Sequence, residues 1–318
     1  MQHFVSSGDL IADRRFEFAK DLEKRGDLVA AADLYAQAVE VAPGFASAWF
    51  ALGELRVRLG DMAAAVDAFR RAGAADPQDR HGATVQLARL TGEAAPMPAG
   101  YVRALFDQYA RHYDLSLLGG LDYRGPQLLL DAVTAACSAL GREPRFDRAV
   151  DLGCGTGLAG AVFAPGVDSL VGVDLSAAMI EQARRTGRYN HLHVADVLEF
   201  LAGERERCAE LVIAADVLPY CPDLGPLIRA VARMLDGGGL FAFTVETHEG
   251  RGVLLRETMR YAHGEDHVRA ALADAGLAGV SLTAASSRRE KSIPVPGLVV
   301  VAVKPASTVP RSDFTSSG

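Results

Sequence analysis

From Tyr101 onward, short apolar runs alternate with longer amphipathic stretches. Each run has the length of one buried strand, and each intervening stretch is long enough for a helix. Strands separated by helices predict a parallel, doubly wound α/β sheet. The runs that we predict as strands are Ala149–Leu152, Leu170–Val173, Leu192–Ala195, Leu211–Ala214, Leu240–Val245, Val280–Thr283 and Leu298–Val303.

An aromatic-rich segment, residues 101–114, precedes the first predicted strand and has the spacing of a helix. Phe106, Tyr109 and Tyr113 lie three or four positions apart, which places them on one helical face. We interpret them either as core packing or as a lid over a ligand. In the second interpretation Tyr109 and Tyr113 are candidate catalytic residues. A further helix is predicted at about residues 126–140.

The first 90 residues contain an internal repeat with a period of 34 residues. Small residues recur where two antiparallel helices would cross closely, and proline recurs where a helix would end. The second copy also reads Trp49-x-x-Leu52-Gly53, and the pattern resembles the tetratricopeptide repeat family, with two ordinary helical hairpins as the alternative. The pairs one period apart are Gly26 and Gly60, Asp27 and Asp61, Ala31 and Ala65, Tyr35 and Phe69, Ala38 and Ala72, and Pro43 and Pro77.

Only two full repeats and one further helix, at about residues 81–90, are visible, whereas three repeats are the usual minimum for an independent stack. We therefore expect this small all-α domain to dock on its neighbour near the lid, through apolar residues around 85–90. A Gly/Pro/Ala-rich stretch marks the boundary. The predicted division is 1–95 for the repeats, 96–130 for a linker and lid helix, 131–305 for the α/β domain and 306–318 for a disordered tail.

Candidate chemistry gathers where the predicted strands end. The first strand runs into Asp151-x-Gly-x-Gly-x-Gly157, and glycines at alternate positions let a backbone turn sharply and approach a ligand. The next three strands end in Asp174, Asp196 and Asp216. The carboxyl edge of an open parallel sheet is where ligands bind, and an acid after the second strand can accept the hydroxyls of a ribose.

Together these residues resemble the class I S-adenosylmethionine-dependent methyltransferases, whose sheet is Rossmann-like, over about residues 101–304. The run Leu235-Asp-Gly-Gly-Gly239 before a fifth strand is a further family feature. The resemblance implies S-adenosylmethionine as cofactor, with the glycine loop around its methionine part, Asp174 at its ribose and Asp196 near its adenine. The candidate cofactor-binding residues are Asp151, Gly153, Cys154, Gly155, Gly157, Asp174, Leu175, Asp196, Val197 and Asp216. With the repeats in front, the chain is similar to a bacterial group of repeat-containing predicted methyltransferases.

Two other interpretations stay open. Gly155-x-Gly157-x-x-Gly160 also matches the dinucleotide fingerprint of NAD(P)-dependent oxidoreductases, and Asp174 lies 19 residues after Gly155. That fingerprint has no need of Asp151 and Gly153, which favours the methyltransferase. Alternatively, the repeats are a scaffold that binds a protein partner, and the methyltransferase fold is inert or regulatory.

The sequence says less about the methyl acceptor than about the cofactor. Asp216-Val-Leu-Pro-Tyr220 departs from the [D/N]-P-P-[Y/F] motif of amino-methyltransferases, which favours a small-molecule or carrier-bound acceptor methylated on oxygen or carbon over one methylated on nitrogen. His263 precedes a helix that should begin at the ligand edge, and it is either a solvent-facing residue or a general base. The charged run Arg288, Arg289 and Lys291 is interpreted as a solvated hairpin or as a device that steers an anionic substrate.

Composition narrows the classes further. Acidic residues outnumber basic ones 40 to 33, giving a net charge of −7, which argues against a general nucleic-acid binder. The four cysteines form no C-x-x-C pair and no zinc-ligand spacing, so we expect no metal and a reducing, cytoplasmic environment. The sequence shows no apolar run of about 18 residues, so no membrane span is expected.

Overall fold

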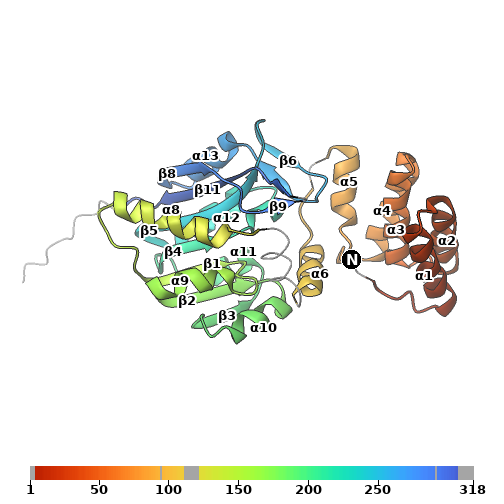
Figure 1. The fold of residues 1–318 in the computed structure, drawn as a ribbon, viewed down its shortest axis with the longest axis horizontal. Helices are drawn as coiled ribbons and strands as arrows, with labels where there is room; N and C mark the ends of the chain where they lie inside the picture. The colour runs from red at the N-terminus through yellow and green to blue at the C-terminus, as the bar shows by residue number, and fades with distance from the viewer. Residues whose placement is uncertain (1–3, 94, 111–121, 291, 307–318) are drawn as a thin grey trace, which may run out of the picture.

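The computed structural model describes residues 4–93, 95–110, 122–290 and 292–306. A helical amino-terminal part and an α/β sheet lie at opposite ends of the molecule, with helices α5 (Ala83–Thr91) and α6 (Ala99–Tyr109) between them (Figure 1). Within these ranges no helix combines the length and the apolar character needed to cross a membrane. The predicted tail, from residue 307 onward, lies outside the described residues.

The amino-terminal part consists of paired antiparallel helices that follow the predicted repeat. The repeated Gly-Asp pairs form the turns, in which Gly26 and Gly60 adopt positive φ and Asp27 and Asp61 cap the next helix by accepting backbone N–H bonds. A Cβ on Gly53 would lie 2.7 Å from the Phe69 ring, so glycine is required where these helices cross. The helices are α1 (Leu10–Lys24), α2 (Leu28–Val41), α3 (Ala46–Arg58), α4 (Met62–Ala75) and α5.

The α/β part is a twisted sheet with strand order β3-β2-β1-β4-β5-β11-β8. Its main strands are β1 (Phe146–Leu152), β2 (Val167–Asp174), β3 (His191–Val194), β4 (Ala209–Ala214), β5 (Leu235–Thr247), β8 (Ala278–Ala284) and β11 (Gly297–Val303), with shorter strands β6 (Val253–Leu255), β7 (Tyr261–His263), β9 (Arg289–Glu290) and β10 (Ile293–Pro294). The helices are α8 (Gly125–Ala139), α9 (Leu158–Phe163), α10 (Ala177–Arg185), α11 (Val197–Gly203), α12 (Gly225–Met234) and α13 (Glu265–Asp274).

The sheet departs from the predicted parallel arrangement at β11 and at the short β6, which pairs antiparallel with β7. β11 runs antiparallel to both β5 and β8, because the connection between β8 and β11 returns through the β9–β10 hairpin and not through a crossover helix. The fifth strand also begins earlier than predicted, at Leu235, so the glycine run lies inside β5.

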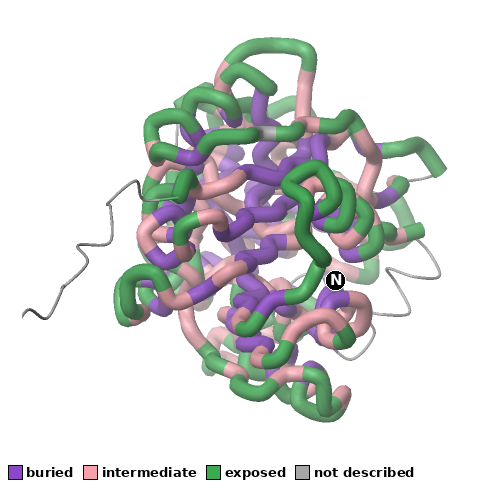
Figure 2. The backbone as a smooth tube through the Cα atoms, turned by 90° about the vertical axis from the view of Figure 1, so that its left-hand side faces the viewer, coloured by how far each residue is buried: buried purple, intermediate pink, exposed green. Residues whose placement is uncertain are grey.

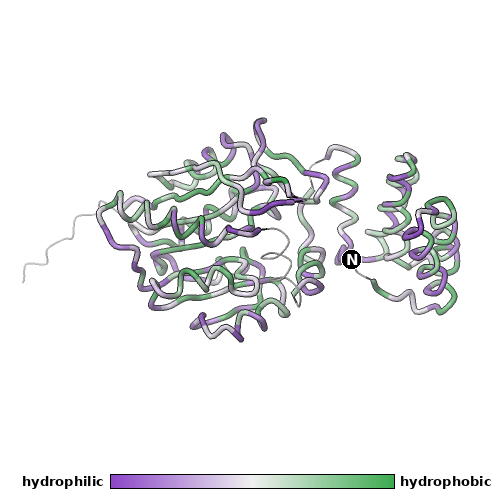
Figure 3. The backbone as a smooth tube through the Cα atoms, viewed as in Figure 1, coloured by the Kyte–Doolittle hydropathy of each residue, from purple (hydrophilic) through white to green (hydrophobic). Residues whose placement is uncertain are grey.

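Alternate strand residues build two apolar layers, one on each face of the sheet. Phe241 and Val300 point toward α11, α12 and α13, whereas Leu240, Ala242 and Val301 point toward α8 and α9. The strands therefore form the buried, apolar centre of this part, seen in Figures 2 and 3. Each large side chain buried there contributes about 1.5–3 kcal/mol.

The repeats meet the rest of the chain through α6. The predicted docking residues Leu87 and Leu90 pack instead into the apolar cluster around Phe69. The turn before α5 makes the contact to α6: Gly82 lies against the Tyr101 ring, where a Cβ would come within 2.9 Å of the ring. The expectation of docking through residues 85–90 is wrong for Leu87 and Leu90, because these side chains complete the core of the repeats themselves.

Candidate functional site

A cavity of about 800 Å³, part of it open to solvent, lies at the carboxyl ends of the parallel strands. The strand-end loops form its floor, and α6 with the segment before it forms one wall. The lining residues are Met97, Ala99, Val102, Phe106, Gly153, Gly155, Asp174, Leu175, Asp196, Val197, Ala215, Asp216, Val217, Tyr220 and Cys221.

The glycine loop after β1 has a backbone that other residues adopt poorly. Gly153, Gly155 and Gly157 all have positive φ, of 65°, 53° and 94°. A Cβ on Gly153 would lie 2.4 Å from Cγ2 of Val217, so a side chain there would displace the β4 loop. The loop therefore presents bare backbone to the cavity and leads into α9, whose N-cap is Gly157.

Asp174, at the end of β2, is buried and fixed by backbone donors. Its Oδ2 accepts from the Gly155 N–H at 2.9 Å and its Oδ1 from the Ser176 N–H at 2.8 Å. Burial raises the pKa of this carboxyl above its ordinary value, the two hydrogen bonds oppose that shift, and the nearby Asp107 adds to it. The carboxylate thus ties the glycine loop to the β2 loop at the cavity wall.

Asp151 lies beneath the glycine loop and is paired with a residue that the sequence analysis missed. The Tyr189 hydroxyl donates to Asp151 Oδ2 at 2.7 Å and accepts from the Gly160 N–H at 3.1 Å. Asp151 Oδ1 is buried with no hydrogen-bond partner among the described residues. Burial raises the pKa of Asp151 to about 7, the Tyr189 hydrogen bond opposes the rise, and Asp174 adds to it. Tyr189 follows α10 in a loop, where no sequence pattern marks it.

Asp151 also lines a second, smaller cavity behind the glycine loop. Its wall includes Tyr123 and Thr156, neither of which was singled out from the sequence. Cys154 lies here too, and its side chain packs against Ile180 and Ala183 of α10.

The other predicted cofactor residues also line the main cavity. Leu175 and Val197 present apolar surface to it. Asp196 has a structural task as well, because its Oδ1 accepts from the Leu198 N–H at 2.8 Å and caps α11. The structure thus brings Gly153, Gly155, Asp174, Leu175, Asp196, Val197 and Asp216 together around one space.

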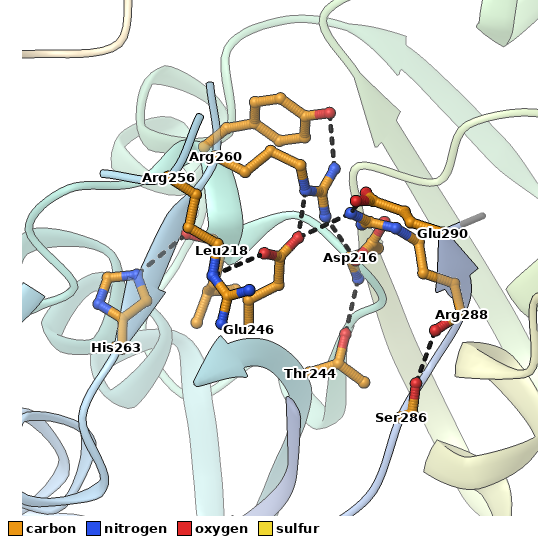
Figure 4. Close-up of polar contacts among 11 residues, drawn as sticks. Asp216, Leu218, Thr244, Glu246, Arg256, Arg260, His263, Ser286, Arg288 and Glu290 are labelled. Atoms are coloured by element: carbon orange, nitrogen blue, oxygen red, sulfur yellow. Dashed lines mark hydrogen bonds and ion pairs between the residues drawn. The ribbon is translucent and has the colours of Figure 1, made fainter. Parts of the chain in front are cut away.

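On the far side of the cavity, Asp216 belongs to a buried cluster of acids and arginines (Figure 4). Arg260 contacts Asp216 Oδ1 at 2.7 Å and also pairs with Glu246. Arg288 reaches Asp216 Oδ2 at 3.4 Å and Glu246 Oε1 at 2.9 Å. Two buried carboxylates and two buried guanidinium groups thus balance one another's charge. We call these four residues the Arg260 cluster; Arg256 and Glu290 pair with it at its edges.

The Arg260 cluster also shapes the cavity wall. Asp216 has a positive φ of 64°, an uncommon conformation for a non-glycine residue, and its N–H donates to Thr244 Oγ1 at 2.9 Å. Arg260 stacks over the Tyr220 ring and donates to its hydroxyl at 2.7 Å. The Tyr220 ring also meets the ring of Phe106 in α6 edge-on, with ring centroids 5.4 Å apart. Asp216 and Tyr220 are therefore held in fixed positions.

The structure corrects the predictions made for Arg288 and His263. Arg288 is 4% exposed, so the interpretation of its run as a solvated hairpin is wrong at this residue, because its charge is balanced inside the protein by the Arg260 cluster. His263 is fully buried in β7 with Nε2 3.4 Å from the Leu218 carbonyl, so it does not face solvent and does not line the cavity. Burial lowers the pKa of His263 to about 4.

The residues predicted to form a lid do not all lie at the cavity. Phe106 lines the cavity, whereas Tyr109 is 42% exposed at the end of α6 and is absent from the cavity wall. Tyr113 and Lys291 lie outside the described residues.

Two family descriptions match the chain. The description "Methyltransferase domain" matches residues 150–243, and "Tetratricopeptide repeat" matches residues 16–80. The first covers the glycine loop, Asp174, Asp196 and Asp216. The second covers the helices with the 34-residue period.

Curated relatives align with part of the chain. Methyltransferase-like protein 27 of Homo sapiens is 41% identical over 88 residues, which are 27% of this chain and 34% of the relative. Malonyl-(acyl-carrier protein) O-methyltransferase of Enterobacter lignolyticus (strain SCF1) is 28% identical over 149 residues, 47% of this chain and 55% of the relative. The chain thus spans a third to about half the length of these relatives.

Among solved structures, the (4+2) cyclase SpnF superposes with a TM-score of 0.52 at 16% identity, covering 67% of this chain and 99% of that one. This likeness shows a shared fold, and the reaction has to be argued from the residues of the site.

Proposed function

Because the chain carries a methyltransferase domain behind tetratricopeptide repeats, we propose that it transfers a methyl group from S-adenosylmethionine to a small-molecule or carrier-bound acceptor. The observation that carries the proposal is the joining of the bare glycine loop to Asp174 at one wall of the strand-end cavity. An inert scaffold has no need of this arrangement.

The described residues fit the cofactor. Asp174 lines the cavity and would accept the ribose hydroxyls, and Val197 with Leu175 would offer apolar surface to the adenine. The unpartnered Asp151 Oδ1 and the small cavity beside it suit the ammonium group of the methionine part. S-adenosylmethionine supplies an activated methyl group on a sulfonium, so the protein mainly orients the acceptor and excludes water.

Calorimetry on the full chain tests this function. We expect S-adenosylmethionine and S-adenosylhomocysteine to bind at micromolar level and NAD not to bind. Binding of NAD in place of both would turn the proposal toward the dinucleotide interpretation, and absence of all binding would favour the scaffold.

We expect cofactor affinity to depend on the ionisation of Asp151. Its pKa near 7 in the free protein means that the carboxyl takes up a proton as the pH falls below 7, whereas an ammonium ligand requires the ionised form. Between pH 7 and pH 5 the dissociation constant should therefore rise up to about tenfold per pH unit. The measurement is a titration with S-adenosylhomocysteine at several pH values. In Asp151→Asn this part of the pH dependence should vanish; an unchanged profile in that variant would remove Asp151 from the ammonium site.

We further propose an oxygen acceptor that is already ionised near neutral pH, such as a carboxylate. Asp216 is paired with two arginines, so its carboxylate is already engaged. Burial raises the pKa of Cys221 to about 12, so its thiol stays protonated at neutral pH. Neither residue is therefore suited to remove a proton from the acceptor. An ionised oxygen attacks the methyl group without first losing a proton. The departure of Asp216–Tyr220 from the amino-methyltransferase motif points the same way.

A labelled-methyl assay tests the acceptor class. The chain is incubated with S-adenosylmethionine carrying a labelled methyl group and a mixed small-molecule extract, and labelled products are identified by mass spectrometry. A methyl ester releases the label as methanol in mild alkali, whereas C-methyl and N-methyl products retain it. Retention of the label would overturn the carboxylate proposal and leave methyl transfer itself intact.

A further inference from the structure

Helix α6 is shared by the two parts of the chain. At its amino-terminal end, Gly100 packs so tightly on the repeats that a Cβ there would lie 1.9 Å from the Gln78 carbonyl oxygen. The ring of the next residue, Tyr101, packs against Gly82, which has φ +78° and is the N-cap of α5. The first turn of α6 therefore packs directly on the turn 78–82 of the repeats.

The other end of α6 belongs to the cofactor cavity. Val102 and Phe106 line it, and the Asp107 carboxylate accepts a hydrogen bond from the Ser176 hydroxyl. Ser176 caps α10, and its N–H donates to Asp174. A second tie holds the preceding segment, because the Tyr261 hydroxyl donates to the Ala95 carbonyl at 2.7 Å.

We propose that the repeats position the cofactor site through α6, with Gly100 and Tyr101 as the positioning residues. The inference rests on the proposed function for its ligand. The line of contacts runs from the turn 78–82 through α6 to Ser176 and Asp174. A helix transmits a displacement of one end to the other because its backbone is hydrogen-bonded throughout. A shift of the turn 78–82 would therefore move Asp107 and the cavity wall together.

Gly100→Ala tests the inference in the full chain. In an exposed helix interior this substitution is stabilising, so any loss reports the clash with Gln78. We expect S-adenosylhomocysteine to bind about 3- to 30-fold more weakly, the range for substitutions that change coupling between sites. The matched control is Gly73→Ala, also a helical glycine, whose Cβ would meet Ala83 alone among the described residues, at 3.9 Å. The control should keep wild-type affinity.

A second pair guards against misfolding of the first variant. Gly82→Ala adds a Cβ against Tyr101 at positive φ, whereas Gly60→Ala carries the same backbone strain with open space around it. Gly82→Ala should weaken binding and Gly60→Ala should not, and because both variants carry the backbone strain, the difference reports the contact with Tyr101. Tyr101→Phe keeps the ring and should bind as the wild type does.

Hydrogen exchange supplies a readout that needs no cofactor. Gly100→Ala should increase exchange in residues 174–179, which Asp107 and Ser176 hold in place, and Gly73→Ala should not. If the wild type binds no S-adenosylhomocysteine, the proposed function fails and this measurement alone decides the coupling. Wild-type affinity together with wild-type exchange in Gly100→Ala would overturn the inference.

Discussion

Arg260→Ala should lower the melting temperature of the chain by roughly 6–20 °C. Removing one partner from a buried ion-pair cluster costs about 3–5 kcal/mol, because the opposite charges stay buried. In a domain of 150–250 residues each kcal/mol shifts the melting temperature by about 2–4 °C. Asp216 and Glu246 would each lose a guanidinium partner, and Tyr220 would lose both its stacked group and its hydrogen bond. Thermal unfolding followed by circular dichroism provides the measurement.

The control for this prediction is Arg251→Ala. Arg251 also makes an ion pair, with Asp266 at 3.1 Å, but its side chain is 94% exposed, and exposed pairs contribute little. We expect its melting temperature to match the wild type. Equal melting temperatures for the two variants would mean that the Arg260 cluster contributes no more than a surface pair.

Asp174→Ala should weaken S-adenosylmethionine binding by about 1.5–3 kcal/mol, or roughly 10- to 150-fold, the range for hydrogen bonds to a charged group. The carboxylate serves the site twice, as the proposed ribose ligand and as the acceptor that joins the Gly155 and Ser176 N–H groups. Calorimetry provides the affinity.

Asp168→Ala is the matched control, because Asp168 is an exposed aspartate at the start of the same strand. It should bind the cofactor as the wild type does. Unchanged affinity in Asp174→Ala would remove the ribose assignment, whereas loss in both variants would point to a general effect on β2.

The parts of the site that depend on short sequence patterns were predictable. Glycines at alternate positions and acids at strand ends identify the cavity floor, because the carboxyl ends of parallel strands meet at one edge. The 34-residue period likewise predicts the paired helices, since each Gly-Asp pair is both turn and cap.

The parts that depend on distant residues were not predictable. Tyr189 reaches Asp151 across 38 positions, and Arg288 reaches Asp216 across 72. A buried arginine and an exposed one look the same in a charged run, because the partner that admits the charge to the core lies elsewhere in the chain. His263 illustrates the reverse case, since a short strand, β7, places it in the interior beside β5.

The close packing of α6 on the turn 78–82 has a consequence for how such chains diverge in evolution. The Gln78 carbonyl leaves room only for a hydrogen atom on residue 100, and the Tyr101 ring leaves room only for a hydrogen atom on residue 82. Repeats exchanged between related proteins would therefore have to bring their own α6, or find one already shaped to them. We therefore expect a unit exchanged by recombination to end after α6, within the wall of the strand-end cavity, and not at the Gly/Pro/Ala-rich stretch before it.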